Sequence, residues 1–528
     1  MSGRGEAMQV DPGLIDFLSR PESYPERPAS IVHHETHISH VFVGDTTAYK
    51  IKKPVDFGFL DFTTLEKRRF FCREEVRLNR RLAPNVYLGV VPIYKYKGAA
   101  EYAFRRQKGS GIAEYAVKMR RIPEERLLYY LIEQGRLLYG ALEEVGAVLA
   151  RFHANATVHR DDPFGGIEVV RTNTEENFEQ IAPCRGITLD EATYSRLVSY
   201  TRDFMEGHAP LFRSRKQDGS VREGHGDLHS RHVCLISPPI VVDCIEFNKR
   251  FRIGDVLEDM GFLLMDLEYC GRFDLSAAVS HAYFSLMPEA ADLELLRFYK
   301  VYRAVVRGKI EGFTADALGD QPGRQAAERR AREYYLLARH YIEDRDRPFN
   351  PVVFMGVSGS GKSAIAQGLF EQALVLRSDR VRKEIAGIPA EEHVYVDYGA
   401  DIYGEDTTAQ VYRTMTRQAA ATARRGERVV VDATFLAASQ RLELYEACMH
   451  TGLNPFFVYC FADEETLKQR IERRIAEGRD LSDAHVSILK RQLGTAEEPV
   501  ELPSFRVLRL DTTGERPEDI RRALRQFL

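Results

Sequence analysis

Long hydrophobic runs are missing from this 528-residue sequence: no stretch approaches the roughly 18 uninterrupted apolar residues of a membrane-spanning helix. The first residues, Met-Ser-Gly-Arg-Gly-Glu, are polar and no apolar export segment follows them. The seven cysteines stand singly, without a Cys-x-x-Cys pair, and 74 basic residues nearly balance 78 acidic ones. We therefore expect a cytoplasmic protein with reduced thiols, no membrane contact and no partner indicated by net charge.

Internal repeats and low-complexity tracts are also missing, while the length exceeds what one hydrophobic core can organise. A charged run with a proline, residues 343–350, separates a helical pattern at 321–341 from a short apolar strand at 351–355. This change in composition predicts a first domain over residues 30–342, a linker over 343–350 and a second domain over 351–528. The oligomeric state is not indicated.

The two predicted domains differ in their hydrophobic patterns. In the first, strand-like segments at 48–52, 90–94 and 115–119 accompany an amphipathic helix at 65–82, and helical periodicity follows from residue 124, including 137–153. In the second, apolar strands at 351–355, 374–376, 429–432 and 456–461 alternate with helical runs such as 364–374. The sequence thus predicts an α+β domain with a small β-rich lobe and a larger helical lobe, followed by an α/β domain with a parallel sheet.

A phosphate-binding loop follows the first strand of the second domain and fits G-x-x-x-x-G-K-[ST] at every fixed position. Glycines let backbone amides wrap around phosphates, the lysine neutralises the β and γ oxygens of ATP, and the last hydroxyl holds magnesium. The predicted ATP-binding residues of this loop are Gly356, Val357, Ser358, Gly359, Ser360, Gly361, Lys362 and Ser363.

Asp432 ends the apolar strand at 429–432, a position from which a second acid can reach the magnesium shell together with Ser363. An aspartate at a strand end is also a common turn former, so the P-loop upstream is what favours the metal role. Ala433 rather than glutamate follows Asp432, and a motor-type or AAA+ ATPase is therefore not favoured.

Asp379 and Arg382 follow the strand at 374–376, where the carboxyl end of a strand meets the P-loop side of a parallel sheet. A carboxylate there can accept the proton of an acceptor hydroxyl, and Arg382, one helical turn later, can fix an anionic group of the substrate. The alternative is an ordinary helix start capped by Ser378 and followed by a solvated charged turn.

Basic residues recur late in the chain, at Arg470 and Arg474, and again at Arg479 after Gly478. Such a segment can close over ATP and bring guanidinium groups to the charge that builds during phosphoryl transfer. A merely solvated arginine face is the alternative.

Together these motifs resemble the P-loop kinases that include gluconate kinase, the polynucleotide 5′-kinases and the zeta toxins, over about residues 350–528. The resemblance implies that Asp379 acts on the acceptor hydroxyl and that arginines of a lid complete the site.

The first domain contains the phrase His225-Gly226-Asp227-Leu228-His229, followed by the apolar strand 239–242 and Asp243. Two aspartates, 16 residues apart, are therefore expected on either side of one β-hairpin. Phosphoryl transfer uses such a division, with one carboxylate directed to the acceptor hydroxyl and another holding magnesium on ATP.

This phrase resembles the aminoglycoside phosphotransferase-like kinases, which share the protein-kinase fold, over about residues 30–310. The resemblance implies that Asp227 is the catalytic base and Asp243 a magnesium ligand. It also implies that Lys50, partnered by Glu75, steadies the ATP phosphates and that residues 117–121 form the hinge strand beside adenine. Lys52 points to the same face as Lys50 and is a rival for its role.

Two departures from that pattern affect the expected activity. His232 occupies the position where the family places a magnesium-binding asparagine, and an imidazole prefers softer ions than magnesium. The segment 38–47 holds only Gly44 and lacks a G-x-G-x-x-G turn. A non-catalytic first domain therefore remains an alternative. The kinase phrase explains His225, His229 and His232 better than a zinc site does, and the histidines at 33, 34, 37 and 40 are interpreted as an ordinary solvated or core-edge set.

The domain order resembles a family of bacterial two-domain proteins in which an aminoglycoside phosphotransferase-like domain precedes an ATP-binding P-loop domain. It implies an enzyme that uses ATP and Mg²⁺ to phosphorylate a hydroxyl of a small-molecule or nucleotide-like acceptor. An ATP-driven switch and a nucleic-acid 5′-end kinase are alternatives, although the balanced charge gives no support for nucleic-acid binding.

Overall fold

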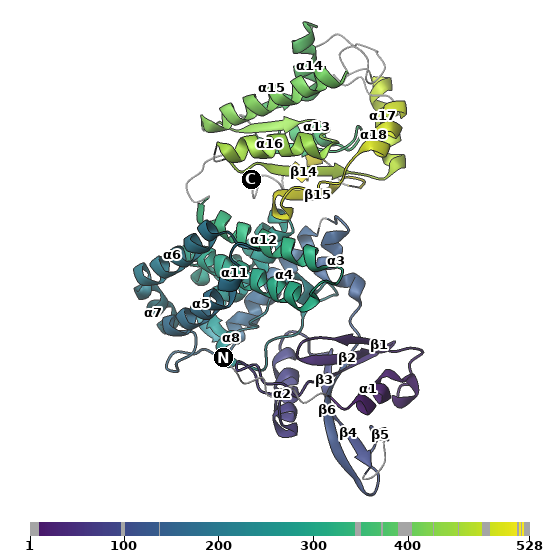
Figure 1. Cartoon of the computed structure of the whole chain (residues 1–528), viewed down its shortest axis with the longest axis vertical. Helices are drawn as coiled ribbons and strands as arrows, with labels where there is room; N and C mark the ends of the chain where they lie inside the picture. The colour runs from purple at the N-terminus through teal and green to yellow at the C-terminus, as the bar shows by residue number, and fades with distance from the viewer. Residues whose placement is uncertain are drawn as a thin grey trace.

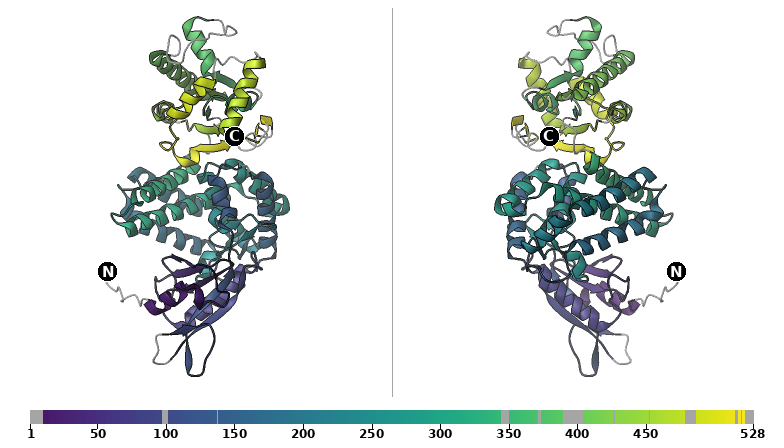
Figure 2. Two further views of the ribbon diagram at one scale, coloured as in Figure 1. Left: turned by 90° about the vertical axis from the view of Figure 1, so that its right-hand side faces the viewer. Right: turned by 90° about the vertical axis from the view of Figure 1, so that its left-hand side faces the viewer.

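The computed structural model describes residues 10–96, 101–136, 138–343, 350–370, 373–388, 404–425, 427–451, 453–477, 486–514, 517, 518, 520 and 521. Three bodies follow one another along the long axis (Figure 1). A β-rich lobe lies at one end, a helical lobe in the middle and an α/β domain at the other end, and both side views show the same order (Figure 2). None of the helices described is both long and apolar enough to span a membrane.

The β-rich lobe is built on a six-stranded antiparallel sheet in the order β1-β2-β3-β6-β4-β5. Helix α2 (Leu65–Asn79) packs against it, starting at Thr64, whose side chain accepts a hydrogen bond from the Lys67 amide. A short helix α1 (Pro12–Ser19) precedes the sheet. The strands are β1 (Val32–Glu35), β2 (Ser39–Val43), β3 (Thr47–Lys52), β4 (Tyr87–Tyr96), β5 (Tyr102–Ala103) and β6 (Ser110–Arg120).

The helical lobe is organised around α9 (Val256–Tyr269), in which every residue is buried. Two small antiparallel pairs lie beside it: β7 (Val221–Glu223) with β10 (Ile253–Asp255), and β8 (Val233–Cys234) with β9 (Ile240–Val241). The second pair is the hairpin expected between Asp227 and Asp243. The other helices are α3 (Leu128–Glu133), α4 (Tyr139–Asn155), α5 (Ile167–Ile181), α6 (Glu191–Gly207), α7 (Ala209–Gln217), α8 (Lys249–Arg252), α10 (Phe273–Leu286), α11 (Leu293–Leu318) and α12 (Arg324–Glu343).

The α/β domain has a five-stranded, fully parallel sheet in the order β12-β13-β11-β14-β15, which confirms the predicted class. Its strands are β11 (Val352–Met355), β12 (Leu374–Arg377), β13 (Val429–Asp432), β14 (Phe456–Phe461) and β15 (Val507–Asp511). Its helices are α13 (Lys362–Ala366), α14 (Ser378–Ala386), α15 (Glu405–Arg424), α16 (Ala438–His450), α17 (Glu464–Glu477) and α18 (Val486–Thr495).

One helix prediction was wrong in extent. The run expected at 364–374 is only the five-residue α13, which ends at Ala366. Gly368 adopts φ +75°, a left-handed conformation that does not continue an α-helix, and Leu374 already begins β12. The predicted linker at 343–350 falls mostly outside the described residues, so the boundaries 30–342 and 351–528 remain predictions.

The α/β domain docks tightly on the helical lobe through the segment before β15. Phe505 is buried in one apolar cluster with residues of the helical lobe, including Tyr269 and Tyr334. A Cβ added to Gly271, which has φ +71°, would lie only 2.2 Å from the Val507 carbonyl oxygen. The Ser504 hydroxyl donates to a carboxylate oxygen of Glu333, 3.0 Å away. The two domains therefore share a close interface of backbone and apolar contacts.

Candidate active sites

Two lysines of β3, in the β-rich lobe, meet three carboxylates, one from α2 and two from the segment after β9. The Lys50 ammonium lies 2.7 Å from Asp243 Oδ1 and 3.0 Å from Glu75 Oε1. Lys52 is almost fully buried, 2.7 Å from Glu75 Oε2 and paired with Glu246. Lys50 is therefore the lysine that reaches Asp243, whereas Lys52 neutralises two buried acids beneath it.

The loop around Asp227 gathers the residues of the first phosphotransferase phrase. The Asp227 carboxylate lies 3.6 Å from His229 Nε2 and 3.7 Å from His232 Nδ1, and His232 Nε2 lies 3.7 Å from Asp243 Oδ2. Burial alone would raise the pKa of the Asp227 carboxyl, but the two histidines hold that pKa well below its usual range. Asp243 has φ +64°, an uncommon conformation for a residue with a side chain, which the surrounding contacts must enforce.

Two aspartates of α9 hold this loop in place, and the sequence analysis missed both. Asp259 accepts hydrogen bonds from the backbone amides of His225 (2.6 Å) and Gly226 (2.8 Å), and Asp266 accepts one from the Ser230 amide (2.8 Å). The available signal was a pair of aspartates seven residues apart, hence on one face, in a helix in which every residue is buried. They fix the backbone from which Asp227 projects.

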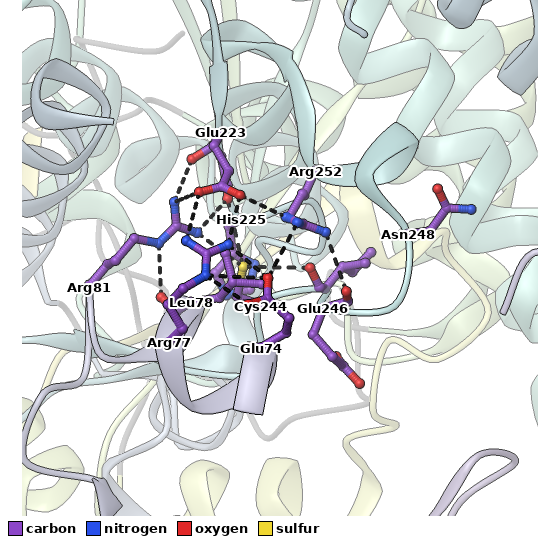
Figure 3. Close-up of polar contacts among 12 residues, drawn as sticks. Glu74, Arg77, Leu78, Arg81, Glu223, His225, Cys244, Glu246, Asn248 and Arg252 are labelled. Carbon is purple, nitrogen blue, oxygen red and sulfur yellow. Dashed lines mark hydrogen bonds and ion pairs between the residues drawn. The ribbon is translucent and has the colours of Figure 1, made fainter. Parts of the chain in front are cut away.

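A cluster of arginines around Glu223 joins the two lobes behind that loop (Figure 3). Arg77 of α2 lies 3.0 Å from Glu223 Oε1, Arg252 lies 3.2 Å from the same oxygen, and Arg81 donates to the Glu223 carbonyl at 2.7 Å. Burial would raise the pKa of the Glu223 carboxyl, but the arginines lower it to about 2. The cluster connects α2, which carries Glu75, to the strand that leads into the Asp227 loop.

The P-loop directly follows β11 and depends on its glycines. A Cβ on Gly356, which has φ +132°, would lie 2.1 Å from the Cys460 carbonyl, so only glycine fits there. The buried Lys362 ammonium donates to the Val357 carbonyl at 3.0 Å, and burial lowers the pKa of Lys362. The Ser358 amide donates to the side chain of Gln492 on α18 at 2.8 Å, a contact that the sequence analysis did not anticipate.

The parallel register brings the predicted acidic residues to one edge of the sheet. Asp432 pairs in register with Phe354 of β11 on one side and with Arg377 of β12 on the other, and Asp379 comes two residues after Arg377. Burial and the neighbouring Asp432 carboxylate raise the pKa of Asp379. Arg382 is buried on α14 and donates to the Thr408 hydroxyl at 3.1 Å. The alternative of a solvated charged turn is therefore wrong for Arg382, whereas the Asp379 side chain is half-buried and its role remains a prediction.

Arg470 of α17 reaches the P-loop: its guanidinium donates to the Thr512 hydroxyl (2.9 Å), to the Thr512 carbonyl (2.6 Å) and, at 3.4 Å, to the Gly359 carbonyl. The Thr512 hydroxyl in turn donates to the Ser360 carbonyl at 3.0 Å. Arg474 follows one turn later on the same helix, where its charge lowers the pKa of Lys362. Arg479 lies outside the described residues.

Comparisons with known proteins divide the chain in the same order. Residues 71–299 match the phosphotransferase enzyme family, and residues 352–499 match the AAA domain family. The chain is 30% identical over 457 residues to the uncharacterized protein Rv2004c of Mycobacterium tuberculosis, across 84% of this chain and 86% of that protein. This chain belongs to that two-domain family. The AAA description differs from the expectation drawn from Ala433, since the family model matches although no glutamate follows Asp432.

Solved structures resemble each half of this two-domain family member separately. A gluconokinase from Sinorhizobium meliloti is 26% identical and covers 35% of this chain and 93% of its own, with a TM-score of 0.25. A choline/ethanolamine kinase family protein from Mesorhizobium loti is 13% identical and covers 63% of this chain and 96% of its own, with a TM-score of 0.39. The chain is an ATP-dependent phosphotransferase, and its acceptor is left unspecified by the family matches.

Proposed function

We propose that the α/β domain transfers the γ-phosphoryl group of ATP to a hydroxyl of a small-molecule or nucleotide-like acceptor. The observation that carries this proposal is the position of Asp379, a carboxylate with a raised pKa at the sheet edge beside Asp432 and Lys362. A carboxylate of raised pKa is a better acceptor for the hydroxyl proton. The buried Arg382, four residues from Ser378 on the same helix, would fix an anionic group of the acceptor.

The P-loop and its neighbours would hold ATP for this transfer. Backbone amides of 356–363 surround the phosphates, and the Lys362 ammonium exchanges its contact with the Val357 carbonyl for the β and γ oxygens. The Ser363 hydroxyl and Asp432 carboxylate are oxygen donors of the kind that Mg²⁺ prefers, and Mg²⁺ bound there would neutralise phosphate charge. Arg470 and Arg474 would stabilise the charge that develops on the transferring group.

The N-terminal domain would carry out a second transfer. Asp227 would accept the acceptor proton, its orientation set by His229 and by the loop anchored on Asp259. Lys50 would steady the ATP phosphates, and Asp243 with His232 would hold the accompanying metal ion. The β-rich lobe and the P-loop domain lie at opposite ends of the molecule (Figure 1). The two transfers would therefore take place at separate sites, and a compound phosphorylated at one would have to leave before it reached the other.

ADP release tests both sites when measured on wild type, Lys362→Ala, Asp379→Asn and Asp227→Ala with pooled sugars, aminoglycosides, nucleosides and 5′-hydroxyl oligonucleotides. We expect one pool to raise ADP release, Lys362→Ala and Asp379→Asn to abolish that increase, and Asp227→Ala to remove a separate acceptor-dependent component. A stimulated rate that survives in Lys362→Ala would exclude transfer by the C-terminal domain.

A second role for the P-loop domain, as an ATP-driven switch for the N-terminal site, is favoured by contacts at both ends of β15. At one end Thr512 bonds the P-loop through Ser360. At the other end Ser504 shares the Glu333 carboxylate with Tyr269, whose ring stacks on Tyr334 with centroids 3.7 Å apart. If this role holds, Lys362→Ala changes transfer at Asp227 while no acceptor stimulates the P-loop site.

A further inference from the structure

The ring of His232 makes a hydrogen bond that decides which of its nitrogens can bind a ligand. Its Nδ1 lies 2.8 Å from the backbone carbonyl oxygen of Asp227. Because a carbonyl can only accept, Nδ1 carries the proton, and the neutral ring then has its lone pair on Nε2. Metal-binding histidines commonly donate the other ring N–H to a carbonyl in this way, which fixes the ring and its tautomer.

The lone pair on His232 Nε2 faces the second oxygen of Asp243. Oδ2 of that carboxylate lies 3.7 Å from Nε2, while Oδ1 is occupied by the Lys50 ammonium at 2.7 Å. A ring lone pair and a carboxylate oxygen that face each other at this separation offer two ligand atoms to one cation.

The separation of these two atoms also limits the type of ion. An ion about 2.1 Å from each atom would hold them at an angle of about 120°. Mg²⁺ demands a near-ideal octahedron with angles of about 90° and oxygen ligands, which a nitrogen at this separation does not supply. Imidazole nitrogen suits first-row transition ions that accept four or five ligands.

The neighbouring His229 has the opposite tautomer and a different role. One oxygen or nitrogen from each of Asp227, His229 and His232 lies within 4.8 Å of the others, as in a three-ligand metal site. His229 Nδ1, however, accepts a hydrogen bond from the Arg231 amide at 3.3 Å, so its Nε2 carries the proton and faces Asp227 at 3.6 Å. We infer that His229 orients the Asp227 carboxylate and leaves His232 as the histidine ligand.

We propose that His232 Nε2 and Asp243 Oδ2 form a binding site for a divalent first-row transition ion, of the class of Co²⁺ or Zn²⁺, in preference to Mg²⁺. Only the role of the ion, which is to accompany ATP at the N-terminal site, rests on the proposed N-terminal transfer. Binding of the ion depends on the two side chains themselves.

Direct metal binding tests the proposal on the full-length protein. Co²⁺ is titrated while its visible absorption is recorded, and Zn²⁺ or Mg²⁺ then competes for the bound Co²⁺. The proteins are wild type, His232→Asn and the control His37→Asn. His37 is an exposed histidine far from His232 and Asp243 in the sequence. We expect His232→Asn to weaken Co²⁺ binding about tenfold or more and His37→Asn to match wild type. Any Co²⁺ bound at the P-loop contributes the same absorption in all three proteins.

Two results would overturn the proposal: a Co²⁺ affinity and spectrum that His232→Asn leaves unchanged, or Mg²⁺ that displaces Co²⁺ from wild type as effectively as Zn²⁺ does. The second comparison uses wild type alone and stands even if the variant fails to fold.

Binding of a non-hydrolysable ATP analogue, measured in a Lys362→Ala background, separates failure of the metal site from failure of the proposed N-terminal transfer. If Co²⁺ binding depends on His232 but no analogue binds, the N-terminal transfer is wrong and the metal site stands. If the analogue binds equally well with Mg²⁺ and Co²⁺, and equally well with and without the His232→Asn substitution, the metal site is wrong and the N-terminal transfer stands.

Discussion

An alanine at position 271 is expected to weaken the docking of the P-loop domain on the helical lobe. Gly271 has φ +71°, and a left-handed alanine costs about 1–2 kcal/mol. Its Cβ would also lie 2.2 Å from the Val507 carbonyl oxygen and 3.1 Å from that of Ser504. Because these are backbone atoms that cannot rotate away, the segment 504–507 must move, which adds about 1–3 kcal/mol by analogy with an overpacked core.

The matched control is Gly186→Ala, because Gly186 has φ +77° but no atom within 4 Å of an added Cβ. Both variants place an alanine in the left-handed conformation, but only Gly271→Ala also brings its Cβ into contact with backbone carbonyl oxygens. The chain has no tryptophan, so differential scanning calorimetry of the full-length protein is the assay. We expect Gly271→Ala to lose more stability than Gly186→Ala and the P-loop domain to unfold in a separate, earlier transition. Equal melting of the two variants would refute the reasoning.

Three further predictions concern charge. Because its pKa is lowered from 4.5 to about 2, Glu223 stabilises the fold above the unfolded value and loses that contribution as pH falls from 4.5 toward 2. Unfolding free energies of wild type and Glu223→Gln should therefore converge on acidification. Lys52→Met should destabilise the chain by about 3–5 kcal/mol, since it leaves the buried Glu246 carboxylate without its cation and Glu75 with only Lys50, whereas Lys50→Met should mainly abolish turnover at the N-terminal site. Asp379→Asn should lower kcat of the acceptor-dependent reaction about 100- to 10,000-fold with little change in the KM for ATP.

Each of these has an outcome that contradicts it. A constant stability difference between Glu223→Gln and wild type across the acidic range would mean that the arginine cluster does not depend on the carboxylate charge. Urea denaturation that ranks Lys50→Met below Lys52→Met would reverse the roles assigned to the two lysines. Initial rates of Asp379→Asn that equal wild type at saturating acceptor would remove the carboxylate from proton transfer.

The sequence by itself determined the chemistry of the two loops and the class of the sheet. The P-loop and the His-Gly-Asp phrase each place their reactive groups within a few residues of one another, so local order is enough to predict them. The alternation of apolar strands with helical runs likewise predicted the parallel sheet, whose carboxyl edge brings Asp432 and the residues after Arg377 together. The excessive length predicted for α13 came from reading apolar periodicity across Gly368.

Tertiary structure alone decided how those groups are supported. Lys50 and Lys52 share one face of a strand and both contact Glu75 of α2, so no periodicity separates them. They differ only in their second carboxylate, Asp243 or Glu246, each from the segment after β9. The anchors of the Asp227 loop come from α9, and the tautomers of His229 and His232 follow from a backbone amide and a backbone carbonyl. Such contacts join segments that are distant in the chain or depend on backbone direction in a loop, and neither property is encoded in the identity of neighbouring residues.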